Sequence, residues 1–102
     1  MPKFALFVKL EAKKGKEAEV EALLNSSLST VENEHGTLSW YAIRMGPSTY
    51  GIFDTFSDNA GREAHLNGKV AKALMAKAGD LLTKPPSIEK IDVLAAKMPE
   101  VV

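Results

Sequence analysis

Two side chains, His65 and Asp54, have the chemistry of an acid–base site. A histidine exchanges a proton near neutral pH, which suits it to act as a general acid or base. His65 belongs to a segment with a helical apolar pattern, but on a straight helix it would lie well off the apolar stripe. It can turn inward only if the helix breaks at Asn67-Gly68. The alternative is a surface histidine with no role.

Asp54 stands in an apolar strand pattern, between Ile52 and Phe56, where an unpaired charge is costly. The interpretation that we favour is structural, with a hydrogen bond to Tyr41 or to an amide at the start of a helix. The functional alternative is that Asp54 orients His65, because acidic groups beside a histidine tune its proton affinity.

Four further side chains could contact a substrate, and each also has an ordinary structural explanation. Trp40 and Tyr41 could line a pocket, although aromatic residues in a hairpin more often belong to a core or a dimer contact. Arg44 could bind a substrate oxygen or bridge two subunits. Asn67 could donate to a substrate carbonyl, but an Asn-Gly pair often breaks a helix for backbone reasons alone.

The composition excludes several classes of function. The chain has 102 residues, with 13 basic and 13 acidic side chains and no cysteine. Balanced charge argues against a nucleic-acid partner, and the lack of cysteine excludes disulfides and thiolate chemistry. No His/Asp/Glu cluster has ligand spacing, so we expect no metal site. No stretch approaches the roughly 18 apolar residues of a membrane span, and no signal peptide is evident. We expect a soluble cytoplasmic protein.

Hydrophobic periodicity predicts a single α+β domain over residues 1–102. The expected order is strand, helix, two strands, helix, strand, which is the ferredoxin-like split βαβ plan with a four-stranded antiparallel sheet. The second helix is expected to start at Ser57 or Asp58 and to break at residues 67–68. The strands are expected at 3–11, 37–45, 49–56 and 87–97, and the helices at 16–34 and 57–82.

The two middle strands should form a hairpin around the Gly46-Pro47-Ser48 turn. If Met45 pairs with Tyr50, Tyr41 lies opposite Asp54, while Trp40 and Arg44 share the other face of the sheet.

The strands carry apolar residues on both faces, while two helices can cover only one. Leaving about 500 Å² of the second face in water would forgo about 12 kcal/mol at about 25 cal/mol per Å², comparable to the stability of a whole domain. We therefore expect an identical sheet, related by a two-fold axis, to cover that face and give a homodimeric α/β barrel. A monomer with a modestly apolar face is the alternative.

Several motifs resemble those of the antibiotic biosynthesis monooxygenase family of dimeric α/β barrels, which includes small quinol monooxygenases. Residues 34–38 (EHGTL) lead into the second strand, and residues 50–58 (YGIFDTFSD) precede a histidine in the next helix. In the family the matching strand commonly ends with an acidic residue, followed two positions later by an aromatic residue. Asp54, Phe56 and His65 occupy the acidic, aromatic and histidine positions.

The resemblance implies a pocket between sheet and helices, where dioxygen oxidises a phenolic or quinol substrate without a bound metal, flavin or other cofactor. His65 would act as a base or hydrogen-bond donor supported by Asp54, and aromatic side chains such as Phe56 would hold the ring. The same superfamily includes haem-degrading enzymes, whose pattern resembles an asparagine on the first strand, a tryptophan in the second helix and a haem-ligating histidine farther along it. This sequence has Val8, His65 and Leu74 at the corresponding positions. We therefore do not expect haem degradation.

The competing hypothesis is a non-catalytic dimeric barrel that binds a small hydrophobic ligand or acts in stress response, because related barrels host unrelated functions. A pocket that holds His65 beside Asp54 favours the enzyme. A pocket filled by Trp40, Phe53 and Phe7 favours the binding protein or a purely structural dimer.

Overall fold

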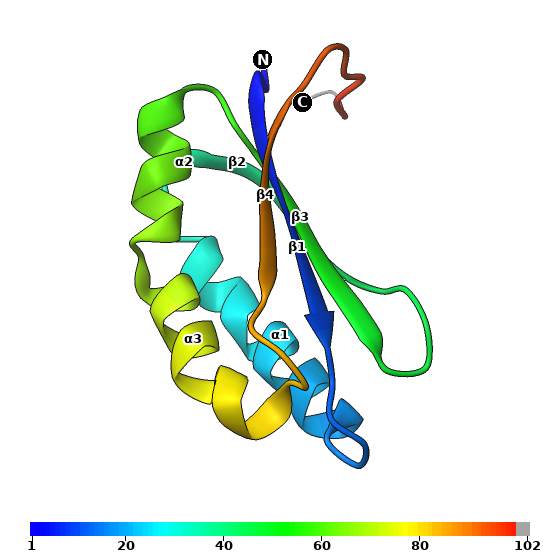
Figure 1. Ribbon diagram of the computed structural model, residues 1–102. Coiled ribbons are helices and arrows are strands. Elements are labelled where there is room, and N and C mark those ends of the chain that lie inside the picture. The colour runs from blue at the N-terminus through cyan, green and yellow to red at the C-terminus, as the bar shows by residue number, and fades with distance from the viewer. Residues whose placement is uncertain (100–102) are drawn as a thin grey trace.

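The computed structural model describes residues 1–99, which form one antiparallel sheet with helices on one side of it (Figure 1). The strands lie in the order β2-β3-β1-β4. This arrangement confirms the α+β ferredoxin-like plan. The elements along the chain are β1 (Phe4–Glu11), α1 (Glu17–Val31), β2 (Thr37–Arg44), β3 (Thr49–Phe56), α2 (Asn59–Leu66), α3 (Lys69–Leu81) and β4 (Ser87–Asp92).

The core lies between the helices and the two central strands, β1 and β3. Val8 pairs with Ile52 and Leu10 pairs with Tyr50, so these side chains project together toward the helices. They pack against apolar residues of α1 and α3, among them Val20, Leu24 and Leu81. Within residues 1–99, no helix has the length and hydropathy needed to cross a membrane.

The predicted break in the second helical segment is present, because α2 ends at Leu66 and α3 begins at Lys69. The apolar stripe predicted for α2 is wrong, however. Ala60 and Ala64 are exposed, and Arg62 is buried. The Arg62 guanidinium lies 5.0 Å from the centre of the Phe4 ring and donates to two strand carbonyls, so its burial is compensated.

The predicted hairpin register is wrong by one residue. Arg44 opposes Tyr50, Tyr41 opposes Phe53 and Trp40 opposes Asp54. The cause is a three-residue turn, since the Met45 N–H donates to the Thr49 carbonyl at 2.7 Å. A shift of one residue moves every side chain of β2 to the opposite face, so Trp40 shares the helix-facing side with Asp54 and Tyr41 does not.

Strand β4 ends at Asp92, five residues before the predicted end at Lys97. Asp92 pairs with Phe4, the first residue of β1, and beyond it the Val93 N–H donates to the Lys3 carbonyl. The chain after Val93 has passed the end of the neighbouring strand, and a strand needs a partner for its backbone groups. Helix α1 is likewise shorter than the predicted 16–34.

The face of the sheet that points away from the helices is apolar near its centre. We call it the outer face. Tyr41 and Ile43 are 54% and 39% exposed there. A Cβ atom on Gly51 would lie within 3.2 Å of the side chains of Ile43, Met45 and Phe7, which shows that these side chains converge over β3. The apolar residues of the outer face are Phe7, Tyr41, Ile43, Phe53 and Ile91.

Asp58 caps α2, because its side chain accepts a hydrogen bond from the Gly61 N–H at 2.8 Å. Replacing Asp58 by alanine removes this acceptor and should lower the free energy of unfolding by about 1 kcal/mol. Urea unfolding measures the change, and D58N is the matched control because asparagine also caps helices. Equal stabilities for D58A and D58N would contradict the capping role.

Candidate acid–base site

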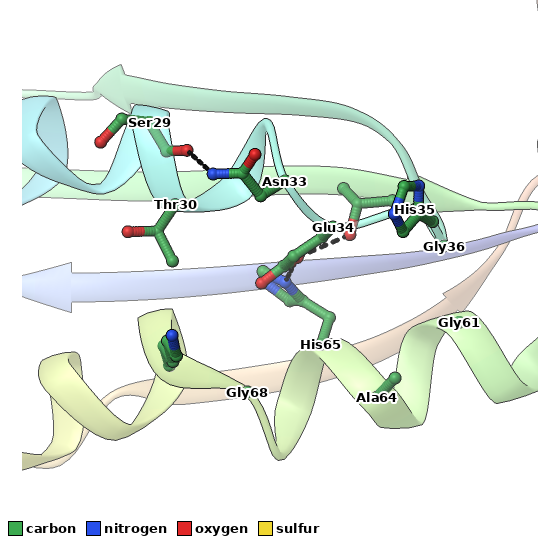
Figure 2. A pocket seen from close by; sticks show the side chains of 12 residues that line it. Ser29, Thr30, Asn33, Glu34, His35, Gly36, Gly61, Ala64, His65 and Gly68 are labelled. Carbon is green, nitrogen blue, oxygen red and sulfur yellow. Dashed lines mark hydrogen bonds and ion pairs between the residues drawn. The ribbon is translucent and has the colours of Figure 1, made fainter.

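The imidazole of His65 lies between two carboxylates, and this arrangement is the most concentrated chemistry in the described chain. Its Nδ1 atom is 2.6 Å from Oε1 of Glu34, and its Nε2 atom is 2.8 Å from Oδ2 of Asp54. Figure 2 shows the Glu34 and His65 side chains reaching toward each other from opposite walls of a cavity. We call Glu34, His65 and Asp54 the acid–base cluster.

Three elements bring the acid–base cluster together. Asp54 comes from the central strand β3 and points to the helical side, while His65 comes from the last turn of α2. Glu34 follows the end of α1, in the turn that leads into β2. Thr37, the first residue of β2, donates its hydroxyl to Glu34 Oε1 at 2.8 Å and so helps to fix the carboxylate.

Two glycines allow the Glu34 turn to approach α2. A Cβ atom built on Gly36 would lie 2.9 Å from the Gly61 Cα, and one on Gly61 would lie 2.8 Å from the Gly36 carbonyl oxygen. Both distances are shorter than any normal carbon contact, so neither position accepts a side chain without moving a backbone segment. This close backbone contact sets the separation that the Glu34 and His65 side chains span.

The acid–base cluster is largely removed from water. Asp54 is fully buried and His65 is 8% exposed. Asp54 has no well-aligned hydrogen-bond donor within residues 1–99, so its contact with His65 is the interaction that balances its charge. The ring of Phe56, with its centre 5.6 Å from that of the imidazole, packs beside it.

The surroundings of His65 have opposite effects on its pKa. Burial lowers the pKa, because it disfavours the charged imidazolium, whereas the contacts with Asp54 and then Glu34 raise it. The two carboxylates prevail, and the pKa of His65 is raised above its ordinary value. The imidazolium form is therefore favoured up to a higher pH than in an ordinary histidine.

A cavity of about 460 Å³ adjoins the acid–base cluster between the end of α1 and the α2–α3 junction. We call it the site cavity. Glu34 and His65 line it, and most of its other side chains are polar. Its volume suits a small ligand of one to three rings. The polar lining residues besides Glu34 and His65 are Ser29, Thr30, Asn33, His35, Thr37 and Lys69.

The antibiotic biosynthesis monooxygenase family matches residues 4–77, which include the whole acid–base cluster. The chain belongs to this family. Comparison with curated proteins gave no significant match.

Solved structures of similar proteins match nearly the whole length of this chain. NE2512, a protein of unknown function from Nitrosomonas europaea, is 55% identical with a TM-score of 0.96, over 99% of this chain and 98% of that one. A Caulobacter crescentus CB15 protein, provisionally assigned as an antibiotic biosynthesis monooxygenase, is 22% identical with a TM-score of 0.79, over 92% of each chain. PA3566 from Pseudomonas aeruginosa is 20% identical with a TM-score of 0.78, over 93% of this chain and 97% of that one. The last two show the fold alone.

Within this family fold, the structure brings His65 and Asp54 together. The structural partners that we favoured for Asp54 are wrong, because Tyr41 points to the outer face and Asp58 provides the cap at the start of α2. The charge of His65 itself compensates the buried carboxylate, which is the alternative that the sequence left open.

Two of the five predicted substrate contacts lie near the acid–base cluster. Trp40 is the cross-strand partner of Asp54 and borders a second groove of about 320 Å³, which Glu34 and Thr37 also line. Its indole Nε1 is buried and has no acceptor within residues 1–99. Phe56 is fully buried and packs against the imidazole rather than lining the site cavity.

The other three predicted contacts lie away from the site cavity. Tyr41 is on the outer face, and Arg44 binds the Glu21 carboxylate on α1. Asn67 lies at the break between α2 and α3, where the sequence alternative placed it, and its side-chain amide also donates to the Glu63 carbonyl at 2.8 Å.

Glu34 is the residue of the acid–base cluster to which sequence reasoning gave no role. Its signal was weak but present, since a carboxylate at the end of a helix faces the negative end of the helix dipole and is unfavourable without a compensating cation. His65 supplies that cation from α2. Within residues 1–99, no group of three His, Cys, Asp or Glu side chains has the arrangement of a metal site.

The raised pKa of His65 makes stability depend on pH. Its stabilising contribution should be fully present below about pH 6.5, the ordinary pKa, and should be lost as the pH rises through the folded value. Urea unfolding from about pH 6 to about pH 9 should therefore show a stability advantage of wild type over H65Q that shrinks as the pH rises. A His65 imidazole signal in NMR that titrates at or below the ordinary value would contradict the proposed charge arrangement.

Proposed function

We propose that the protein is a cofactor-independent monooxygenase that oxidises a small phenolic or quinol substrate with dioxygen. The observation that carries the proposal is the buried contact of His65 with Asp54 and Glu34 beside a cavity of ligand size. Family membership agrees with this chemistry. The arrangement favours the enzyme over the binding-protein alternative, because His65 lines the cavity and contacts the buried Asp54 behind it.

The chemistry needs a deprotonated, electron-rich ring. When a hydroquinone loses a phenolic proton, its ring becomes a stronger electron donor and can reduce dioxygen directly. One oxygen atom then enters the ring and the other leaves as water, so a hydroquinone and dioxygen give a hydroxyquinone and water. The acid–base cluster supplies the proton transfer, which typically contributes a factor of about 10² to 10⁴ in rate.

The proposal includes a homodimer formed through the outer face. Phe7 and Phe53 pair directly there, beside the exposed Tyr41 and Ile43. A second copy related by a two-fold axis can cover this face with its own. A cytoplasmic location remains the expectation stated from the sequence.

Oxygen consumption with a panel of hydroquinones tests the activity. Wild type should consume oxygen with at least one of them. H65Q and D54N should lower the rate about 10²-fold or more, because each removes a charged member of the acid–base cluster that transfers the substrate proton. D80N is the matched control, since Asp80 is exposed on α3. No oxygen uptake by wild type would overturn the proposed activity. Equal uptake by H65Q and wild type would overturn the role of the acid–base cluster in that activity.

Sedimentation velocity tests the dimer. Wild type should sediment as a dimer at micromolar concentration, and I43D should shift it toward the monomer, because the buried charge would lack a partner. M75D is the control, since Met75 is similarly exposed but lies on α3. A monomeric wild type, or a dimer that M75D disrupts and I43D does not, would overturn this interface.

A further inference from the structure

Both ring nitrogens of His65 already face carboxylate oxygens, so the imidazole has no free lone pair for a substrate. A neutral imidazole would place an unprotonated nitrogen within 2.6 Å of Glu34 or 2.8 Å of Asp54, where two acceptors would repel each other. With both nitrogens protonated, each contact joins a donor to an acceptor. The geometry thus favours a cationic His65, which donates a hydrogen bond to Glu34 and forms an ion pair with Asp54.

Asp54 is also unable to receive a substrate proton. Its side chain is fully buried, and it lines none of the cavities that border the acid–base cluster. The only carboxylate of the cluster that reaches the site cavity is Glu34, which is partly exposed.

The two oxygens of Glu34 have different surroundings. His65 Nδ1 and the Thr37 hydroxyl both contact Oε1, at 2.6 Å and 2.8 Å. No hydrogen bond within the described chain uses Oε2, which lies beside Gly68 at the cavity wall. A Cβ atom built on Gly68 would lie 3.4 Å from Oε2, which places this oxygen next to the α2–α3 junction. One oxygen is therefore anchored and the other is available as an acceptor.

We propose that Glu34 is the catalytic residue that takes the proton from a phenolic hydroxyl bound in the site cavity, with Oε2 as the acceptor atom. His65 and Asp54 are positioning residues that hold Oε1 and balance its charge. This assignment rests on the proposed function and names the group that touches the substrate.

The proton transfer balances in charge and atoms. The substrate O–H bond breaks and leaves its electron pair on the phenolate oxygen, while a new O–H bond forms on Glu34. The acid–base cluster changes from one net negative charge, with two carboxylates and one imidazolium, to neutral. The negative charge passes to the phenolate oxygen in the site cavity, so the net charge of the cluster and the substrate together is unchanged.

The elements that pack around His65 place several other charged or titratable side chains near its imidazole. Asp54 belongs to β3 and Glu34 to the turn after α1, while His35 and Lys69 line the site cavity. Arg62 is on the same helix, but it donates to the Ala5 and Ile91 carbonyls and is therefore engaged elsewhere. Lys69 is the lysine of the cavity wall, and its positive charge favours a substrate that becomes a phenolate.

The rate assay uses E34Q with substrates of graded acidity. Glutamine keeps the size of the side chain and an oxygen for His65 and Thr37, but it cannot accept the substrate proton. With hydroquinone, E34Q should lower kcat about 10²-fold or more with little change in KM. With 2,6-dichlorohydroquinone, which is more acidic, is partly ionised at neutral pH and keeps two ring C–H positions for oxygenation, the deficit should shrink. E19Q is the control, because Glu19 is exposed on α1. A deficit independent of substrate acidity would assign Glu34 to structure only and overturn the proposal.

A binding measurement without turnover separates this proposal from the proposed function. Para-nitrophenol reports its ionisation by absorbance, and wild type should bind it as the phenolate at a pH where the free compound is neutral. E34Q should bind it without this ionisation, and E34D should retain part of it because the charge is kept at shorter reach. Ionisation by E34Q equal to that of wild type, or no binding by wild type, would overturn the assignment of Glu34. Failure of hydroquinone oxidation alone, with nitrophenol ionised by wild type and not by E34Q, would overturn the oxidation chemistry and leave Glu34 as the proton acceptor.

Discussion

The contact of one buried cation with two carboxylates constrains how β3, α2 and the turn after α1 can pack together. Asp54 is fully buried on a central strand, and a carboxylate there is costly unless a cation meets it. His65 provides that cation, and its second nitrogen then requires Glu34. The contacts thus couple β3, α2 and the turn after α1, and a displacement of any one of these segments leaves a buried charge without its partner.

The backbone is adapted to this requirement at positions where a side chain would interfere. Gly36 and Gly61 let the turn before β2 touch α2, because a Cβ atom on either would lie within 2.9 Å of the backbone of the other. The interruption between α2 and α3 lets α2 present Arg62 and His65 to the sheet, a face that a continuous helix with the predicted stripe would not bury. Asp58 fixes the start of this short helix only four residues after Asp54. The strand, the cap and the helix therefore form a compact unit around the acid–base cluster.

The same strand serves both faces of the sheet. Along β3, Ile52 and Asp54 point to the helices while Phe53 points to the outer face between Phe7 and Tyr41. Alternation along a strand makes the two roles inseparable, because a shift of one residue would exchange the buried carboxylate for a phenyl ring. A second subunit on the outer face would stabilise the strand that carries Asp54, although it would not contact the site cavity through that face.

Local patterns determined much of this fold. The alternation in β1 and β3, the cap at Asp58 and the Asn67-Gly68 break are properties of neighbouring residues, and each is found where the sequence predicts it. The motif around Asp54, Phe56 and His65 was likewise sufficient to indicate the family. The end of β4 was not predictable in this way, because residues after Asp92 have strand-like composition and only the length of the adjacent β1 limits the pairing.

The tertiary structure alone decided which charges meet. The sequence named His65 and Asp54 as chemically informative, but their contact depends on the rotation of α2, and the inclusion of Glu34 depends on two glycines 25 residues apart approaching within van der Waals distance. The hairpin register, which separates Trp40 from Tyr41, depends on a loop one residue shorter than the one that pairing Met45 with Tyr50 would leave. Periodicity specifies the face of each element, whereas the distance between charged groups on different elements is set by packing, and that distance controls the proton chemistry.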